Sequence, residues 1–338
     1  PHIPVSSILT PFDANTDDRV GPSSWASKYG KTPEIIVASS GAALDVLAQD
    51  YNPSTPWNAV LMHIVPRSDG EGYKVTQALT DLPMLDRVMG LAVDGEGNRY
   101  YATGVDESAR VNPEYPPPDT YRSDIVRVVK VGRTGAVLYN IDLDIARHEA
   151  NPDAEMIINP MTFGSARLAV GGNEIGLVHS INTDPDWSIE GRRHQKALST
   201  RLDASTGAIL RTSSVWVSHS FDQRLLYDGE SIIEHHLGDA YPRTIVFGRP
   251  DPTPPGWDAA YPLFHIKGKL GDNRTWTRLG NVALIEDDPA YRYLALFVTE
   301  SSAATASSIN GPRNLAIVRV REDDNSLDPS LPDTLTVI

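Results

Sequence analysis

The sequence predicts an all-β protein, a single β-propeller of five or six four-stranded antiparallel blades. Short strands with period-two alternation, tight turns rich in Gly, Asn and Asp, and a hairpin unit that recurs at a nearly constant spacing all favour this fold. A chain of 338 residues is long enough for one large all-β domain. We therefore expect one propeller domain over residues 1–338.

The hairpins follow one another along the chain. Predicted strands flank a DGEGN turn in VMGLAVDGEGNRYYATGV (88–105), a GGN turn in RLAVGGNEIGLVHSI (167–181) and a DG turn in RLLYDGESIIEHHL (224–237). Gly and Asn supply the positive φ angles that tight hairpins need. Val, Ile, Leu and Tyr on either side suit a pleated surface.

The spacing of these units points to blades. Their first strands begin near residues 33, 88, 166, 222 and 277, and the one long interval contains the insertion NPEYPPPDTY (112–121). A β-sandwich, or two in tandem, is the alternative, but sandwiches rarely repeat a double hairpin so regularly. We expect the terminal segments 1–32 and 324–338 to close the ring, either by completing the last blade or as a sixth one.

Composition limits the partners. The formal net charge is -14, with 44 acidic against 30 basic residues, which argues against nucleic acid because phosphate binding needs a concentrated positive face. No apolar run approaches the length of a transmembrane helix, so we expect no membrane insertion. Cysteine is absent, which excludes disulfides and thiolate-bound zinc. The chain begins with Pro1 rather than Met, so we expect a processed, secreted or periplasmic protein.

Polar residues gather where the predicted inner strands begin. In a propeller the loops that lead into these strands meet at one mouth of the central channel. The guanidinium groups of arginines at this mouth can bind carboxylate, sulfate or phosphate groups with two hydrogen bonds. We therefore expect an anionic small molecule or polysaccharide as partner. The substrate-binding candidates are Arg167, His194, Gln195, Gln223, Arg224, Arg243 and Arg278. The alternative is that the arginines form ion pairs with Asp222, Asp228 and Asp239 and so join neighbouring blades.

Catalytic candidates lie in the same region. His219 is the candidate base, and Tyr227 or Tyr241 is the candidate acid, since imidazole and phenol groups can transfer protons. The stretch SHSFDQRLLYDG…GDAYPR is similar in its residue types, over one predicted blade, to propeller-fold polysaccharide lyases. That resemblance implies a lyase that cleaves uronate polysaccharide by β-elimination, with the arginines holding the carboxylate.

Two other functions remain open. One is a recognition propeller without catalysis, either lectin-like or a scaffold for a protein partner. The other is a calcium-dependent lactonase or esterase, because calcium takes six to eight oxygen ligands and several Asp, Asn and Glu side chains are available. Arginines at the same mouth of the channel would repel a cation. We therefore expect neither a metal nor another cofactor, and a bound Ca²⁺ ion is the alternative.

Overall fold

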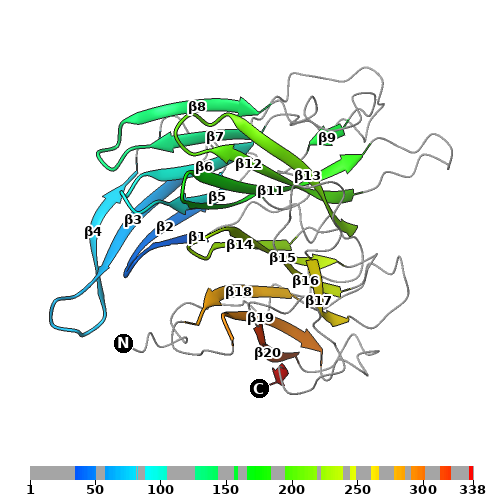
Figure 1. The fold of residues 1–338 in the computed structure, drawn as a ribbon. Helices are drawn as coiled ribbons and strands as arrows, with labels where there is room; N and C mark the ends of the chain where they lie inside the picture. The colour runs from blue at the N-terminus through cyan, green and yellow to red at the C-terminus, as the bar shows by residue number, and fades with distance from the viewer. Residues whose placement is uncertain are drawn as a thin grey trace.

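Five antiparallel sheets follow one another along the chain in the computed structural model (Figure 1). The structure describes residues 35–50, 58–80, 82, 88–104, 126–143, 156–158, 166–183, 195–218, 222–238, 244–248, 260–265, 278–285, 291–300, 313–320 and 335–337. Within these ranges all regular elements are strands. None of the described residues belongs to a helix long and apolar enough to cross a bilayer.

Each sheet is one blade with its strands in chain order. Blade 1 consists of β1 (Ile35–Ser40), β2 (Ala43–Asp50), β3 (Asn58–Pro66) and β4 (Tyr73–Leu79). Blade 2 consists of β5 (Val88–Val93), β6 (Arg99–Gly104), β7 (Val126–Val131) and β8 (Val137–Leu143). Blade 3 consists of β10 (Ala166–Gly171), β11 (Glu174–Thr183), β12 (Gln195–Asp203) and β13 (Ile209–Ser218), with β9 (Met156–Ile158) added beside β11.

Blade 4 consists of β14 (Asp222–Tyr227), β15 (Ile232–Gly238), β16 (Thr244–Gly248) and β17 (Ala260–His265). Blade 5 consists of β18 (Arg278–Leu284), β19 (Tyr293–Glu300), β20 (Arg313–Val320) and β21 (Leu335–Val337). The predicted all-β propeller is therefore confirmed, with five four-stranded blades. The C-terminal strand completes blade 5, whereas segment 1–32, also predicted to close the ring, lies outside the described residues.

The predicted hairpin turns have the expected chemistry. Gly97 and Gly229 have φ angles of 84° and 98°, a region that only glycine enters freely. The aspartate before each turn accepts backbone N–H groups: Asp94 from Glu96 and Asn98, and Asp228 from the two residues after Gly229. Side chain and backbone thus fix these turns together.

Apolar clusters fill three of the blade interfaces. One joins blades 1 and 2 and includes Ile36, Leu47, Leu61, Val88, Leu91 and Tyr101. A second joins blades 2 and 3 and includes Met89, Tyr100, Val128, Ile175, Leu177 and Leu198. A third joins blades 4 and 5 and includes Ile233, Ile245, Phe247, Tyr293, Phe297 and Val318. Burial of these side chains is the main force that holds neighbouring blades together.

The interface between blades 3 and 4 has a different, polar character. Arg201 of β12 pairs with Glu234 of β15 at 3.0 Å, and both side chains are almost completely buried. Ser199 donates a hydrogen bond to the same carboxylate, and the His236 imidazole lies 2.8 Å from its second oxygen. Burial alone would raise the pKa of Glu234, but Arg201, His236 and Ser199 outweigh it and the pKa is lowered.

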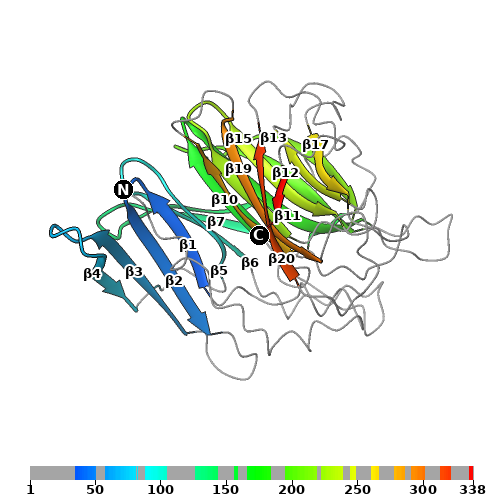
Figure 2. The same ribbon diagram turned by 90° about the horizontal axis from the view of Figure 1, so that it is seen from below.

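Contacts between the described inner strands link four pairs of neighbouring blades. β1 contacts β5, β5 contacts β10, β10 contacts β14, and β14 contacts β18. Among the described residues no comparable contact joins β18 to β1. Figure 2 shows blade 1, in blue, set apart from blade 5, in orange and red. Blades 1 and 5 are therefore the first and last blades in the series of contacts that the described residues make.

Candidate functional site

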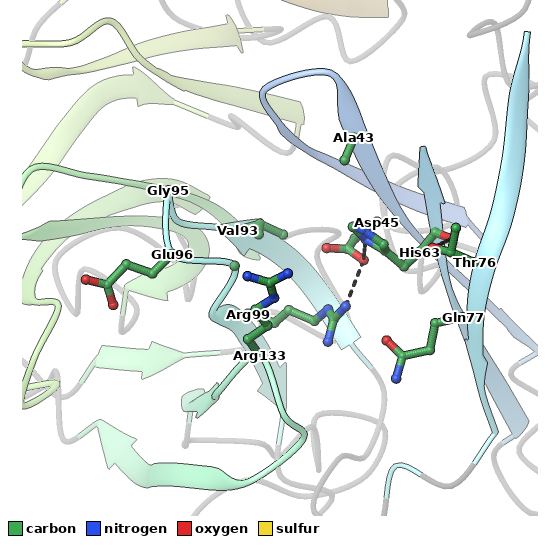
Figure 3. A pocket seen from close by; sticks show the side chains of 11 residues that line it. Ala43, Asp45, His63, Thr76, Gln77, Val93, Gly95, Glu96, Arg99 and Arg133 are labelled. Atoms are coloured by element: carbon green, nitrogen blue, oxygen red, sulfur yellow. Dashed lines mark hydrogen bonds and ion pairs between the residues drawn. The ribbon is translucent and has the colours of Figure 1, made fainter. Parts of the chain in front are cut away.

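A cavity of about 530 Å³ lies between blades 1 and 2 (Figure 3). Blade 1 contributes residues from β2, β3 and β4, and blade 2 contributes the β5–β6 hairpin and the turn after β7. The polar lining residues are Asp45, His63, Thr76, Gln77, Glu96, Arg99 and Arg133. Only Ala43 and Val93 add apolar side chains to this lining.

Strand pairing places three of these side chains in one row. Asp45 of β2 lies opposite His63 of β3, which in turn lies opposite Gln77 of β4. Directly paired residues point to the same face of a sheet, so the row shares the face that packs on blade 2. Leu47 and Leu61, two residues along each strand, are buried on that face. Polar groups therefore occupy one end of an otherwise apolar interface.

A buried ion pair forms the floor of the cavity. Arg99, the first residue of β6, lies with one guanidinium nitrogen (Nη2) 3.2 Å from Oδ1 of Asp45. The same oxygen lies 3.0 Å from Nδ1 of His63. Asp45 and Arg99 are 2% and 4% exposed, so their charges are nearly removed from water. A pair of this kind is stable only with further partners, and its disruption costs several kcal/mol.

Arg99 is not fully satisfied by this arrangement. Its Nε atom is buried and has no hydrogen-bond partner among the described residues. A buried donor without a partner costs about 1–3 kcal/mol. Such groups are uncommon in folded proteins and call for an explanation, of which a ligand-binding role is one.

A second guanidinium lies beside the first. Arg133 follows β7 and packs against Gly97, where a Cβ would lie 3.4 Å from its Cδ. Figure 3 shows Arg99 and Arg133 side by side in the cavity, whereas the Glu96 side chain points away from both. Arg99, Arg133 and His63 thus lie near the Asp45 carboxylate, while Glu96, the second carboxylate of the lining, points away. The cavity brings two guanidinium groups together on a chain whose net charge is -14.

The rim on the side of blade 2 is held rigidly. Asp94 accepts hydrogen bonds from the Asn98 side chain at 2.8 Å and from the Tyr100 hydroxyl at 2.9 Å. Burial would raise the pKa of Asp94, but these bonds and those from the backbone lower it. Burial, and then the bond to Asp94, raise the pKa of Tyr100. The turn that presents Gly95, Glu96 and Gly97 is therefore fixed by a charged, hydrogen-bonded aspartate.

Two of the predicted channel arginines act between blades. Arg167 of β10 donates a hydrogen bond to the backbone oxygen of Met89 in blade 2, at 2.8 Å. Arg224 of β14 donates to the oxygen of Leu279 in blade 5, at 3.1 Å, and to its neighbour Gln223. Each arginine therefore bridges adjacent inner strands through a carbonyl group.

Tyr227 lies at the far end of its strand from the predicted site. It is the last residue of β14, and the strand rises about 3.3 Å per residue, so it lies about 16 Å from Asp222. Its hydroxyl donates to the backbone oxygen of Gly229 at 2.8 Å. The structure therefore does not bring Tyr227 to the end of β14 that follows His219.

The remaining predicted residues are only partly described. Gln223 is completely buried on β14. Gln195 and Arg278 begin β12 and β18, and Arg278 thus shares the wall of inner strands with Arg167 and Arg224. His194, His219, Tyr241 and Arg243 lie outside the described residues. The channel-mouth site stays a prediction.

The cavity residues were not selected from the sequence, although a signal was present. Asp45 interrupts the apolar stretch ALDVLAQ at a position that shares a face of the sheet with Leu47. His63 interrupts NAVLMHIVPR at a position that shares the same face with Leu61. A charged residue on the core face of a predicted strand needs a buried partner. The partner, Arg99, is 54 residues from Asp45, and nothing in the sequence links the two. Among the described residues no group of three or more His, Asp or Glu side chains could hold a metal ion.

No family model and no curated protein match the chain. Among solved structures, the β-propeller domain of the Trilobed protease from Pyrococcus furiosus matches with 6% identity and a TM-score of 0.40, covering 88% of this chain and 74% of that one. A Trypanosoma rangeli sialidase in complex with 2,3-difluorosialic acid matches with 13% identity and a TM-score of 0.44, covering 86% and 46%. The GH43_1 enzyme from Xanthomonas citri complexed with xylose matches with 9% identity and a TM-score of 0.40, covering 91% and 89%. Likeness at this level concerns the fold alone and does not identify a ligand for this chain.

Proposed function

We propose that this propeller binds a small acidic saccharide, such as a uronic acid or a short uronate oligomer, in the cavity between blades 1 and 2. The observation that carries the proposal is the placement of Arg99 and Arg133 side by side in a polar cavity, with Asp45 and His63 beside them. Arg133 is not seen paired with a carboxylate of the lining in Figure 3, and a guanidinium group binds a carboxylate with two parallel hydrogen bonds, so the arrangement favours an acidic ligand.

The lining supports a ligand rich in hydroxyl groups. Most small-molecule pockets are largely apolar with a few polar groups, but here the proportion is reversed. Gln77 and Thr76 can donate and accept hydrogen bonds, and Asp45 can only accept them. A saccharide offers donors and acceptors on every side, and its carboxylate would bind next to Arg133. A volume of about 530 Å³ is within the range of ordinary ligand sites.

Thermal shift and calorimetry with a small panel of sugars test this proposal. Galacturonate and glucuronate should raise the melting temperature, because a ligand that binds only the folded state stabilises it. Galactose and glucose, which lack the carboxylate, should have little effect at the same concentration. Arg133→Ala should weaken uronate binding about 10–100-fold, the equivalent of one lost charge-assisted hydrogen bond of about 1.5–3 kcal/mol.

Arg67→Ala is the matched control. Arg67 is an exposed arginine in the turn after β3, paired with Asp69 outside the cavity. This variant removes the same charge from the protein and should leave uronate affinity unchanged. Equal losses in both variants would mean that only the total charge matters, and equal binding of neutral and acidic sugars would contradict an anion site.

Cleavage is a separate proposal that rests on the predicted channel residues. From the sequence, the expected base is His219 and the expected acid is Tyr227 or Tyr241. Tyr227 ends β14, whereas His219 precedes the start of that strand, so Tyr241 is the acid in this proposal. Uronate elimination would produce an unsaturated product with a new ultraviolet absorbance. His219→Ala should abolish this signal and leave the melting temperature unchanged. Export to the periplasm or the medium also stays a proposal, which fractionation of cells that produce the full-length protein would test.

A further inference from the structure

Among the described lining residues of the cavity, His63 is the one whose charge changes near neutral pH. The other polar members of the lining are carboxylates, guanidinium groups and uncharged side chains, whereas an imidazole ordinarily titrates at about pH 6.5. The side chain of His63 is 30% exposed, so protons reach it from the solvent. A change in its charge acts on whatever the cavity binds.

Asp45 determines which nitrogen of His63 exchanges that proton. Nδ1 lies 3.0 Å from Oδ1 of Asp45, and Figure 3 shows the two side chains next to each other. The carboxylate of Asp45, in its ion pair with Arg99, accepts hydrogen bonds and donates none, so Nδ1 carries a hydrogen in both charge states of the ring. The proton that His63 gains or loses is therefore the one on Nε2, on the other side of the ring.

The Nε2 atom of His63 is available to a ligand. It makes no hydrogen bond to any residue that the structure describes, and the ring lines the cavity. A neutral imidazole has a lone pair at Nε2, which accepts a hydrogen bond from a hydroxyl group and repels a carboxylate oxygen. A protonated imidazole has a positively charged N–H there, which donates a charge-assisted hydrogen bond to a carboxylate. Protonation thus changes this atom from an acceptor into a donor for an acidic group.

The charged and titratable groups around His63 come from its own blade and from blade 2. They are Asp45 and, opposite Val65 on the same face, the exposed Lys74 in blade 1, and Glu96, Arg99 and Arg133 in blade 2. Asp45 pairs with Arg99, and the Glu96 side chain points away from the cavity. Protonation of His63 would therefore add a positive charge to a cavity that already contains the guanidinium group of Arg133.

We propose that binding of the acidic saccharide is coupled to protonation of His63, whose Nε2–H group donates a hydrogen bond to the ligand. This inference rests on the proposed saccharide site and states how pH regulates it. By linkage, the proton and the anion raise each other's affinity by the same factor. Uronate affinity should fall about 10–100-fold between about pH 5.5 and pH 8.5. The ligand keeps its charge throughout, because a carboxyl group of this kind titrates at about pH 3.5.

Calorimetry of galacturonate binding in two buffers with different ionisation enthalpies measures the proton uptake directly. At about pH 7.5, above the ordinary titration range of histidine, the wild-type protein should take up about one proton for each galacturonate bound. His63→Gln keeps a side chain that can donate a hydrogen bond but cannot be protonated. This variant should bind galacturonate without proton uptake and with an affinity that no longer changes with pH.

Gln77→Ala is the matched control. Gln77 lies opposite His63 on β4 and lines the same cavity, but its amide does not titrate. Loss of this side chain should weaken galacturonate binding and leave the proton uptake at the wild-type value. The comparison separates loss of affinity from loss of the coupled proton.

A second measurement follows the His63 ring itself by nuclear magnetic resonance. The imidazole C–H resonances report the charge of each ring, and the spectrum of His63→Gln identifies the resonance of His63. Saturating galacturonate should move the midpoint of its titration to higher pH by about 1–2 pH units, which corresponds to the same 10–100-fold coupling. Glucose, which lacks the carboxylate, should leave the midpoint where it is.

Failure of the coupling and failure of the site give different results. If wild-type protein binds galacturonate without proton uptake, and with the same affinity across this pH range, the coupling is overturned and the saccharide site stands. Equal proton uptake by wild type and His63→Gln would assign the proton to another group and would also overturn the coupling. Absence of galacturonate binding at every pH would contradict the site itself, and the coupling with it.

Discussion

The ring of Tyr227 in blade 4 lies directly on Gly171 in blade 3, so closely that a Cβ at position 171 would lie 2.0 Å from the ring carbons. Ile232 occupies a similar place over Gly176 of β11, where a Cβ would meet it at 2.8 Å. Two glycines thus let large side chains of blade 4 approach the backbone of blade 3. Both contacts lie at the interface between blades 3 and 4, beside the Arg201–Glu234 ion pair. None of the three apolar clusters described above lies at this interface.

Gly171→Ala should therefore destabilise the protein. The added methyl group has no room beside Tyr227, and overpacking of this kind costs about 1–3 kcal/mol. Urea unfolding of the variant should show a lower midpoint with an unchanged slope. Gly95→Ala is the control, because a Cβ at Gly95 meets nothing within 4 Å, and a similar loss in both variants would contradict the packing argument.

Glu234→Gln should lower stability most at neutral pH. The folded state lowers the pKa of Glu234, so its carboxylate stabilises the fold above the ordinary glutamate pKa of about 4.3. That contribution is lost as pH falls through the lowered value, where the wild-type side chain becomes neutral like Gln. The variant should cost about 3–5 kcal/mol at pH 7, because Arg201 is left buried without its partner.

Measurements of unfolding from pH 7 down to pH 2 test whether the stabilisation by Glu234 is lost on acidification. The difference in unfolding free energy between wild type and variant should shrink steadily below about pH 4.3. Glu174→Gln is the control, since its pair with Arg211 is about one-third exposed and is worth less than about 1 kcal/mol. A difference that grows on acidification would show that Glu234 is not the titrating group.

Gln49→Leu should weaken the contact between blades 1 and 2. The Gln49 amide donates to the backbone oxygen of Val88 at 2.6 Å and accepts from its N–H at 3.1 Å, so the side chain acts like an extra strand residue. Leucine has a similar volume but leaves both backbone groups of Val88 unpaired, at a cost of about 1–3 kcal/mol each. Hydrogen exchange should accelerate at Val88 and its neighbours in β5 before it does in blades 4 and 5. Uniform exchange throughout the chain would argue against this local role.

Much of the fold follows from short-range patterns. Alternation and glycine turns predict the hairpins because strand pairing and turn geometry depend on residues that are close in the chain. The hairpin RLLYDGESII is an example: Asp228 and Gly229 form its turn, and the paired strands run on either side. The repeat of such units then predicts blades, since similar units can bury their faces only on one another.

The site could not be predicted in the same way. Asp45, His63 and Arg99 belong to three strands of two blades, and their contact depends on how the blades pack. For the predicted channel residues, the sequence gives the strand but not the direction or partner of the side chain. Arg167 and Arg224 are such cases, because each is used to bind a carbonyl group of the next inner strand.

A crystal structure of the protein soaked with galacturonate would show directly where the acidic sugar binds. We predict the carboxylate within hydrogen-bond distance of Arg133, with the sugar hydroxyls on Gln77 and Asp45 between blades 1 and 2. Galacturonate bound instead where β14 and β18 begin, near Arg224 and Arg278, with the cavity filled by water alone, would disprove the cavity site and return the binding site to the channel mouth.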